Sequence, residues 1–101
     1  MIVRNGKTYH YAPINVTIDE EAHKKVDYGK QQPFNAYIYP ASGQVQAETY
    51  GNELKYILNL LTNEDVLKEG YGVAYNSTEI NYKVISIKEY TGHFLCELKK
   101  L

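Results

Sequence analysis

Residues 80–101 constrain the fold more than any other stretch of the chain. Two segments rich in β-forming side chains flank Thr91-Gly92, and glycine tolerates the positive φ that a two-residue hairpin loop needs. A loop at these residues predicts that Tyr90 faces His93, Lys88 faces Leu95, Ile87 faces Cys96, Ser86 faces Glu97 and Ile85 faces Leu98.

One face of this hairpin is apolar, and its members are Ile85, Ile87, Phe94, Cys96 and Leu98. A register shifted by one residue would set Ile87 opposite Glu97, so the turn and the hydrophobic pattern select the same register. An isolated hairpin is marginally stable in water. The rest of the chain must therefore cover this face, and the sequence predicts a core built on the C-terminal hairpin.

Length and charge narrow the class of protein. With 101 residues we expect one domain spanning residues 1–101. The formal net charge of -1 gives no basic excess, so a general nucleic-acid-binding role has no electrostatic support. No stretch approaches the roughly 18 apolar residues of a membrane helix, and the N-terminal residues do not read as a signal peptide. We expect no contact with a membrane.

Alternating apolar side chains predict further strands. The pattern occurs over residues 14–18, with Ile14, Val16 and Ile18 on one face, and over residues 34–39, with Phe34, Ala36 and Ile38 on one face. Weaker signals are a small hairpin over residues 2–9 around Asn5-Gly6, a possible strand over 44–50 and a short strand over 71–76. Strands at this spacing, without repeated strand–helix units, predict a mainly β fold, an antiparallel barrel or sandwich.

Two segments leave alternatives open. Residues 19–29 are the most polar; a short helix capped by Asp19 would bury only Ala22 and Val26, so an exposed excursion is the better interpretation. Residues 53–62 fit a helical stripe (Leu54, Ile57, Leu58, Leu61) and also a strand face (Leu54, Tyr56, Leu58, Leu60). Ten residues cannot separate the two periods, and local propensity favours helix.

The titratable residues do not form a catalytic constellation. His10, His23 and His93 lie in different segments and lack the spacing of a metal site, so we expect no metal and no cofactor. Cys96 lies three residues from His93 on one strand, which puts the two on opposite faces and predicts a core cysteine rather than a nucleophile. We expect the protein not to be an enzyme.

Tyrosine is the unusual component, with 11 Tyr against 2 Phe and no Trp. Tyr37, Tyr39, Tyr50 and Tyr56 could form an exposed aromatic surface of the kind enriched at protein interfaces, or could pack in a barrel. Barrel packing is slightly favoured. Tyr37 and Tyr39 are the candidate aromatic interface.

Several stretches, taken in order, resemble one family. They are Ile38-Tyr-Pro-Ala-Ser-Gly43, residues 50–61 beginning Tyr50-Gly-Asn-Glu-Leu-Lys, then Gly70-Tyr-Gly-Val73, and Asn81–Tyr90 with His93. They are similar to the small minor capsid or head-closure (head-to-tail connector, stopper-type) proteins of tailed phages and prophages of Gram-positive bacteria. The resemblance covers most of residues 34–99. It implies a small antiparallel β-barrel that forms a homo-oligomeric ring in the virion, joins head to tail and helps retain packaged DNA.

The resemblance also implies partners and a candidate site. The partners would be portal, adaptor and tail-completion proteins, with DNA only as channel content, and the protein would be found in the virion and, during assembly, in the host cytoplasm. The channel-narrowing loop would be Pro40–Asn52, with candidate interface residues Ser42, Gln44, Gln46, Glu48, Tyr50 and Asn52. This loop has no Lys or Arg, so it could plug a channel but not grip phosphates.

Other points stay open. The resemblance makes residues 53–62 a barrel strand, against their local propensity. It does not distinguish the stopper from the adaptor or tail-terminator position. The alternative class is a small β-barrel that binds a ligand or an oligonucleotide, which ranks lower because the lysines do not cluster among exposed aromatics in the sequence.

Overall fold

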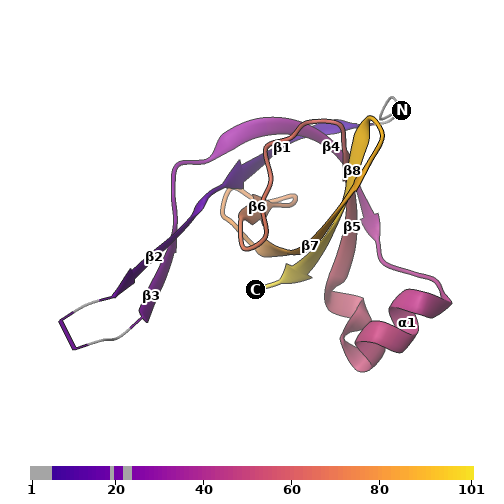
Figure 1. Cartoon of the computed structure of the whole chain (residues 1–101), viewed down its shortest axis with the longest axis horizontal. Helices are drawn as coiled ribbons and strands as arrows, with labels where there is room; N and C mark the ends of the chain where they lie inside the picture. The colour runs from indigo at the N-terminus through magenta and orange to yellow at the C-terminus, as the bar shows by residue number, and fades with distance from the viewer. Residues whose placement is uncertain (1–5, 19, 22–23) are drawn as a thin grey trace.

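The structure, a computed structural model, describes residues 6–18, 20–21 and 24–101 and is dominated by a closed antiparallel β-barrel (Figure 1). The barrel strands are β1 (Lys7–Ala12), β4 (Gln32–Pro40), β5 (Ile57–Thr62), β6 (Gly72–Ala74), β7 (Tyr82–Tyr90) and β8 (His93–Lys100), joined in the order β1-β4-β5-β8-β7-β6. The predicted mainly β barrel with a C-terminal hairpin and one short helix is confirmed.

Side chains fill the interior of the barrel. Alternate positions of β4 and β8 point inward, so that the predicted inner face of β4 is confirmed, and Leu67 joins the core from the connection between β5 and β6. The buried cluster consists of Phe34, Ala36, Ile38, Leu58, Leu60, Leu67, Val73, Val84, Cys96 and Leu98, with tyrosines such as Tyr9, Tyr11 and Tyr82 packed against it. For these tyrosines, barrel packing is the observed role.

The register of the β7–β8 hairpin agrees with the prediction from its turn as far as Ser86 opposite Glu97. Beyond that point a β-bulge intervenes, and Val84 rather than Ile85 faces Leu98, so the prediction is wrong at Ile85. A bulge adds an unpaired residue and increases the local twist, which a small closed barrel needs. Its consequence is that Val84 is buried while Ile85 is half-buried.

A two-stranded ribbon projects from the barrel (Figure 1). The predicted strand over residues 14–18 is confirmed as β2 (Ile14–Ile18). The segment expected as an exposed excursion over 19–29 does project, with Val26 and Asp27 exposed, but it contains a strand that was not predicted, β3 (Lys24–Tyr28), which pairs with β2. Pairing satisfies the backbone groups along one edge of β2, which lies outside the closed barrel. Asp19, the predicted helix cap, and His23 lie outside the described residues, as does much of the predicted hairpin over residues 2–9.

Residues 44–56 are helical, so the expected strand over 44–50 is wrong. Helix α1 (Gln44–Tyr50) continues into a 3-10 helix, η1 (Gly51–Tyr56), before β5 begins. Gln, Ala and Glu are good helix formers, Gly43 and Gly51 bracket α1 with φ of 99° and 54°, and the barrel closes without a strand here. The strand expected over 53–62 is therefore right for Ile57–Thr62 and wrong for 53–56.

Candidate functional site on the outer wall of the barrel

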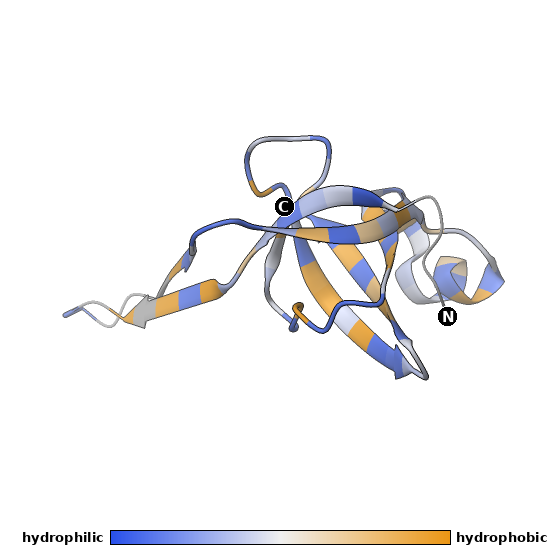
Figure 2. Ribbon diagram, turned by 90° about the horizontal axis from the view of Figure 1, so that it is seen from above, coloured by the Kyte–Doolittle hydropathy of each residue, from blue (hydrophilic) through white to orange (hydrophobic). Residues whose placement is uncertain are grey.

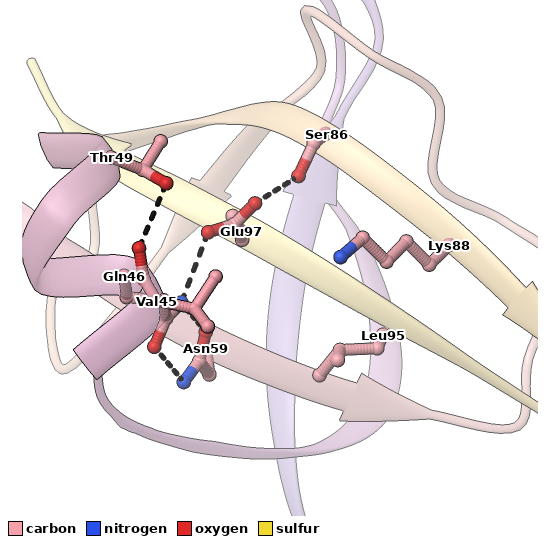
Figure 3. Close-up of a pocket in the computed structure, with 8 residues that line it drawn as sticks. All are labelled: Val45, Gln46, Thr49, Asn59, Ser86, Lys88, Leu95 and Glu97. Carbon is pink, nitrogen blue, oxygen red and sulfur yellow. Dashed lines mark hydrogen bonds between the residues drawn. The ribbon is translucent and has the colours of Figure 1, made fainter. Parts of the chain in front are cut away.

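Two rows of side chains cross the outer wall of the barrel, and the strand register places them side by side. One row consists of Tyr37, Leu61, Leu95 and Lys88. The other, the polar row, consists of Tyr39, Asn59, Glu97 and Ser86. Each row runs over β4, β5, β8 and β7 in turn. Helix α1 lies beside this wall, so the wall and the helix together form a candidate site (Figures 1 and 3).

Gln46 of α1 connects the helix to the polar row (Figure 3). Its Nε2 donates to Asn59 Oδ1 at 2.7 Å and to Glu97 Oε2 at 3.0 Å, and its Oε1 accepts from Asn59 Nδ2 at 3.2 Å. The backbone N–H of Ser42 also donates to Gln46 Oε1, at 3.1 Å. Every polar atom of the Gln46 amide is therefore engaged.

Glu97 is the charged centre of the polar row. Ser86 Oγ donates to Glu97 Oε1 at 2.7 Å, and the Tyr50 hydroxyl is a further hydrogen-bond partner. Burial by itself would raise the pKa of Glu97, but the hydrogen bonds from Gln46, Ser86 and Tyr50 and the charge of Lys88 together hold it below its usual value. Burial and the bond to Glu97 raise the pKa of Tyr50 to about 12, so Tyr50 stays protonated and can donate.

Polar contacts rather than apolar ones hold the helical segment to the barrel. Helix α1 and η1 contain no buried residue. Apart from the Gln46 and Tyr50 contacts, Lys99 Nζ of β8 lies 3.0 Å from Glu53 Oε2 of η1, a partly exposed ion pair of the kind that contributes little. Attachment of α1 therefore depends on the bonds to Asn59 and Glu97.

A cavity of about 320 Å³ lies between α1 and the outer wall, and Figure 3 shows the side chains that line it: Val45, Gln46, Thr49, Asn59, Ser86, Lys88, Leu95 and Glu97. The Lys88 ammonium and the Leu95 side chain point toward it. Among the described residues no buried side-chain polar atom lacks a hydrogen-bond partner, and no group of three or more His, Cys, Asp or Glu residues could hold a metal ion. The cavity offers a saturated polar floor beside apolar Val45 and Leu95.

The residues predicted for the channel loop divide between the site and the solvent. Gln46 and Tyr50 reach the polar row, whereas Gln44 and Glu48 bond to each other on the exposed side of α1, at 3.3 Å. Ser42 contributes through its backbone, and Asn52 is exposed in η1. The structure brings two of the six side chains to the site.

The candidate aromatic interface is a stacked pair. The rings of Tyr37 and Tyr39 lie 5.2 Å apart with an interplanar angle of 26°, at the β4 end of the two rows. Tyr50 instead binds Glu97, and the exposed Tyr56 lies under the ammonium of Lys55 at 5.1 Å. Of the four tyrosines, Tyr37 and Tyr56 are therefore exposed, and the stacked pair joins Tyr37 to the half-buried Tyr39.

The sequence did not predict the assembled site, although the hairpin register paired some of its members. The hairpin register predicted Ser86 opposite Glu97 and Lys88 opposite Leu95, and both pairs are confirmed. Asn59 joins them only through the pairing of β5 with β8. The hairpin pattern identified the side chains on its outer face, but which strand lies beside the hairpin depends on closure of the barrel.

The remaining titratable candidates lie away from this site. Cys96 is buried in the barrel core, as predicted, and burial raises the pKa of its thiol to about 12. The His93 ring stacks on Tyr90 with centroids 5.0 Å apart at the end of the hairpin. The strand therefore keeps His93 and Cys96 apart.

The chain matches no family model, no curated protein and no solved structure. In the part of the chain that the structure describes, no helix combines the length and the apolar character needed to cross a membrane.

Proposed function

We propose that this protein is a non-enzymatic structural subunit of the head-to-tail connector of a tailed phage or prophage. In this proposal it takes a head-closure, stopper-type or minor capsid position and assembles as a ring. The ring joins the head to the tail and helps retain packaged DNA, and the portal, adaptor and tail-completion proteins are its neighbours. The protein works in the virion and, during assembly, in the host cytoplasm.

One observation carries the proposal: a barrel packed with its own side chains extends two separate appendages into solvent. The ribbon β2–β3 leaves one side and the helical segment 44–56 lies at the other (Figure 1). Both carry exposed apolar side chains, including Ile18 on the ribbon and Val45 on α1. Exposed apolar groups on projecting elements are typical of protein interfaces, and the resemblance noted above supplies the phage setting.

The helical segment fits the part of the proposal that concerns the DNA channel. It overlaps the expected loop Pro40–Asn52 over residues 44–52, carries Glu48 but no Lys or Arg up to Asn52, and is held by polar bonds. Because the segment has no buried side chains, its release from the barrel wall would expose no core residue and would break only polar contacts, chiefly those of Gln46 and Tyr50. In a ring, it would narrow or plug the channel without gripping phosphates.

Deleting residues 41–50 from the gene in an inducible prophage tests the proposal. Capsid shells should form, but DNA-filled heads should leak or fail to join tails, because the channel segment is missing. A matched control is the double variant Lys68→Ala and Glu69→Ala, which changes two exposed residues in the connection between β5 and β6 and should yield normal particles. Infectious particles in normal yield from the deletion would refute the proposal. Portal and major capsid genes beside this gene would support it at lower cost.

A second candidate, a small ligand- or oligonucleotide-binding barrel, is favoured by the stacked Tyr37–Tyr39 pair. This pair lies on the same outer wall as Lys88, with β5 and β8 between them, and a wall that carries stacked aromatic rings and a cation is one way to hold a single-stranded nucleic acid. Titration of labelled oligo(dT) at low salt tests it. Binding that Tyr37→Ala and Lys88→Ala both weaken would favour this function over the connector.

A further inference from the structure

The ribbon β2–β3 has one apolar face that is only half covered. Antiparallel pairing sets Ile14 opposite Tyr28 and Val16 opposite Val26, with Ile18 further along the same face. Val16 and Val26 are each 48% exposed, and Ile18 is 73% exposed. Figure 2 shows the resulting bands of apolar colour along the projecting ribbon.

The root of the same face is covered by the barrel. A Cβ atom placed on Gly70 would lie 3.6 Å from Ile14, and one placed on Gly72 would lie 2.9 Å from Tyr28. The contact between Gly70 and Ile14 is an ordinary van der Waals distance, whereas Gly72 leaves the room that Tyr28 needs at the root of the ribbon. The outer half finds no such support in the described part of the chain. A two-stranded ribbon is marginal in water, and both of its edges are open to pairing. The outer half therefore presents an uncovered apolar face that a partner surface can bury.

The cavity beside α1 has the properties of such a partner surface. Val45 is 76% exposed at its rim and Leu95 lies in its wall. Its polar floor is already bonded within itself, through Gln46 to Asn59 and Glu97. A polar ligand would have to break these bonds, whereas apolar side chains would cover Val45 and Leu95 without disturbing them. The cavity therefore suits an apolar insert.

Charge matches the two surfaces as well. Glu20 is exposed in the turn that joins β2 to β3, two residues beyond Ile18. The Lys88 ammonium points into the cavity, and Glu97 beside it already accepts hydrogen bonds from Gln46 and Ser86. An acidic turn entering beside Lys88 would be attracted, and such complementarity fixes the register of an interface.

The two surfaces lie on opposite sides of one molecule, whose longest extent is 46 Å, so the ribbon does not reach the cavity of its own chain (Figure 1). We propose that the outer half of the ribbon of one copy packs Val16, Ile18 and Val26 into the cavity between α1 and the outer wall of a second copy. This contact is heterologous, and its repetition closes a ring or extends a filament. The ring form rests on the proposed connector function, which it deepens.

Disulfide trapping tests the contact on the full chain. Ile18→Cys combined with Val45→Cys places both new thiols at exposed positions, and the buried native Cys96 can stay. Under mild oxidation this variant should give a ladder of covalent oligomers. The matched control combines Ile18→Cys with Ser77→Cys, an exposed loop position away from the cavity. Cross-linking should be about tenfold or more faster than in the control, because a docked contact raises the local thiol concentration above the micromolar bulk value.

Charge reversal makes the test specific. Lys88→Glu in the trapping variant should slow the ladder, and adding Glu20→Lys should restore it. Rates equal to the Ser77 control, or dimers through Ile18→Cys alone, would refute the contact; the second result would indicate ribbon-to-ribbon pairing. Failure of trapping while deletion of residues 41–50 still blocks head–tail joining would refute this contact and leave the connector function standing. If the trapping variant gives the ladder but deletion of residues 41–50 leaves phage production normal, the contact would be supported and the connector function would be refuted.

Discussion

Gln46→Ala should loosen the helical segment from the barrel, because this one side chain carries most of the contacts between α1 and the polar row. The variant removes two hydrogen bonds to Asn59 and one to Glu97. Asn59 is only 7% exposed, so its amide would lose partners in a largely buried position. The bonds that remain to Glu97 come from Ser86 and Tyr50.

The size of the effect follows from what replaces these bonds. A buried polar group left without a partner costs about 1–3 kcal/mol, and bonds to a charged group are at the strong end of the usual range. The adjoining cavity of about 320 Å³ admits water, which can satisfy part of the exposed amide. We therefore expect Gln46→Ala to lower the free energy of unfolding by about 1.5–3 kcal/mol.

Urea denaturation followed by circular dichroism measures this loss. Gln44→Ala is the matched control, since Gln44 is exposed on the same helix and bonds only to Glu48; it should change stability by less than about 0.5 kcal/mol. Amide hydrogen exchange gives a second readout: the helical N–H groups of Ala47 and Gly51 should exchange faster in Gln46→Ala. Equal stability of the two variants, with unchanged exchange, would refute the view that Gln46 attaches the helix.

Further predictions concern the same wall and the core behind it. The folded state holds the pKa of Glu97 below its usual value of 4.5, so the stabilisation from ionised Glu97 should be complete above pH 4.5 and should be lost as the pH falls below it. The difference in unfolding free energy between wild type and Glu97→Gln should therefore narrow in acid. A difference that stays constant from pH 7 to pH 3 would contradict this prediction. Leu98→Ala should cost about 2–5 kcal/mol in chemical denaturation, because Leu98 is fully buried; a loss below about 0.5 kcal/mol would show that Leu98 does not face the core. Cys96 should react slowly with thiol reagents in the native protein, since burial raises its pKa to about 12, and rapid labelling without denaturant would contradict the buried placement.

Much of the barrel was predictable because its strongest signals are local. The Thr91-Gly92 turn and the alternation on either side of it set the β7–β8 register for residues 86–97, and the alternation at Phe34, Ala36 and Ile38 identified the inner face of β4. In these places turn chemistry and the two-residue period agree. Segments in which independent local signals agree can be predicted from the sequence.

Where local signals were weak or conflicting, tertiary structure decided. Residues 44–50 alternate like a strand, but β4 pairs directly with β5, so the barrel has no place for another strand and the segment follows its helix propensity. The polar residues 24–28 became β3 because β2 projects from the barrel and pairs with them there. The bulge near Ile85 arises from barrel curvature, which no local pattern encodes.

The candidate site shows the same division. The tyrosine content of the sequence singled out Tyr37 and Tyr39, and the hairpin turn paired Ser86 with Glu97, whereas Gln46 and Tyr50 became candidates through the family resemblance. Only barrel closure brought Asn59 beside Glu97, and only the helical form of residues 44–50 turned Gln46 toward both. Gln46 lies 13 positions from Asn59 and 51 positions from Glu97 in the sequence, so these hydrogen bonds depend on which strands become neighbours. The physical reason is that burial of the whole core, rather than any one segment, decides which strands pair.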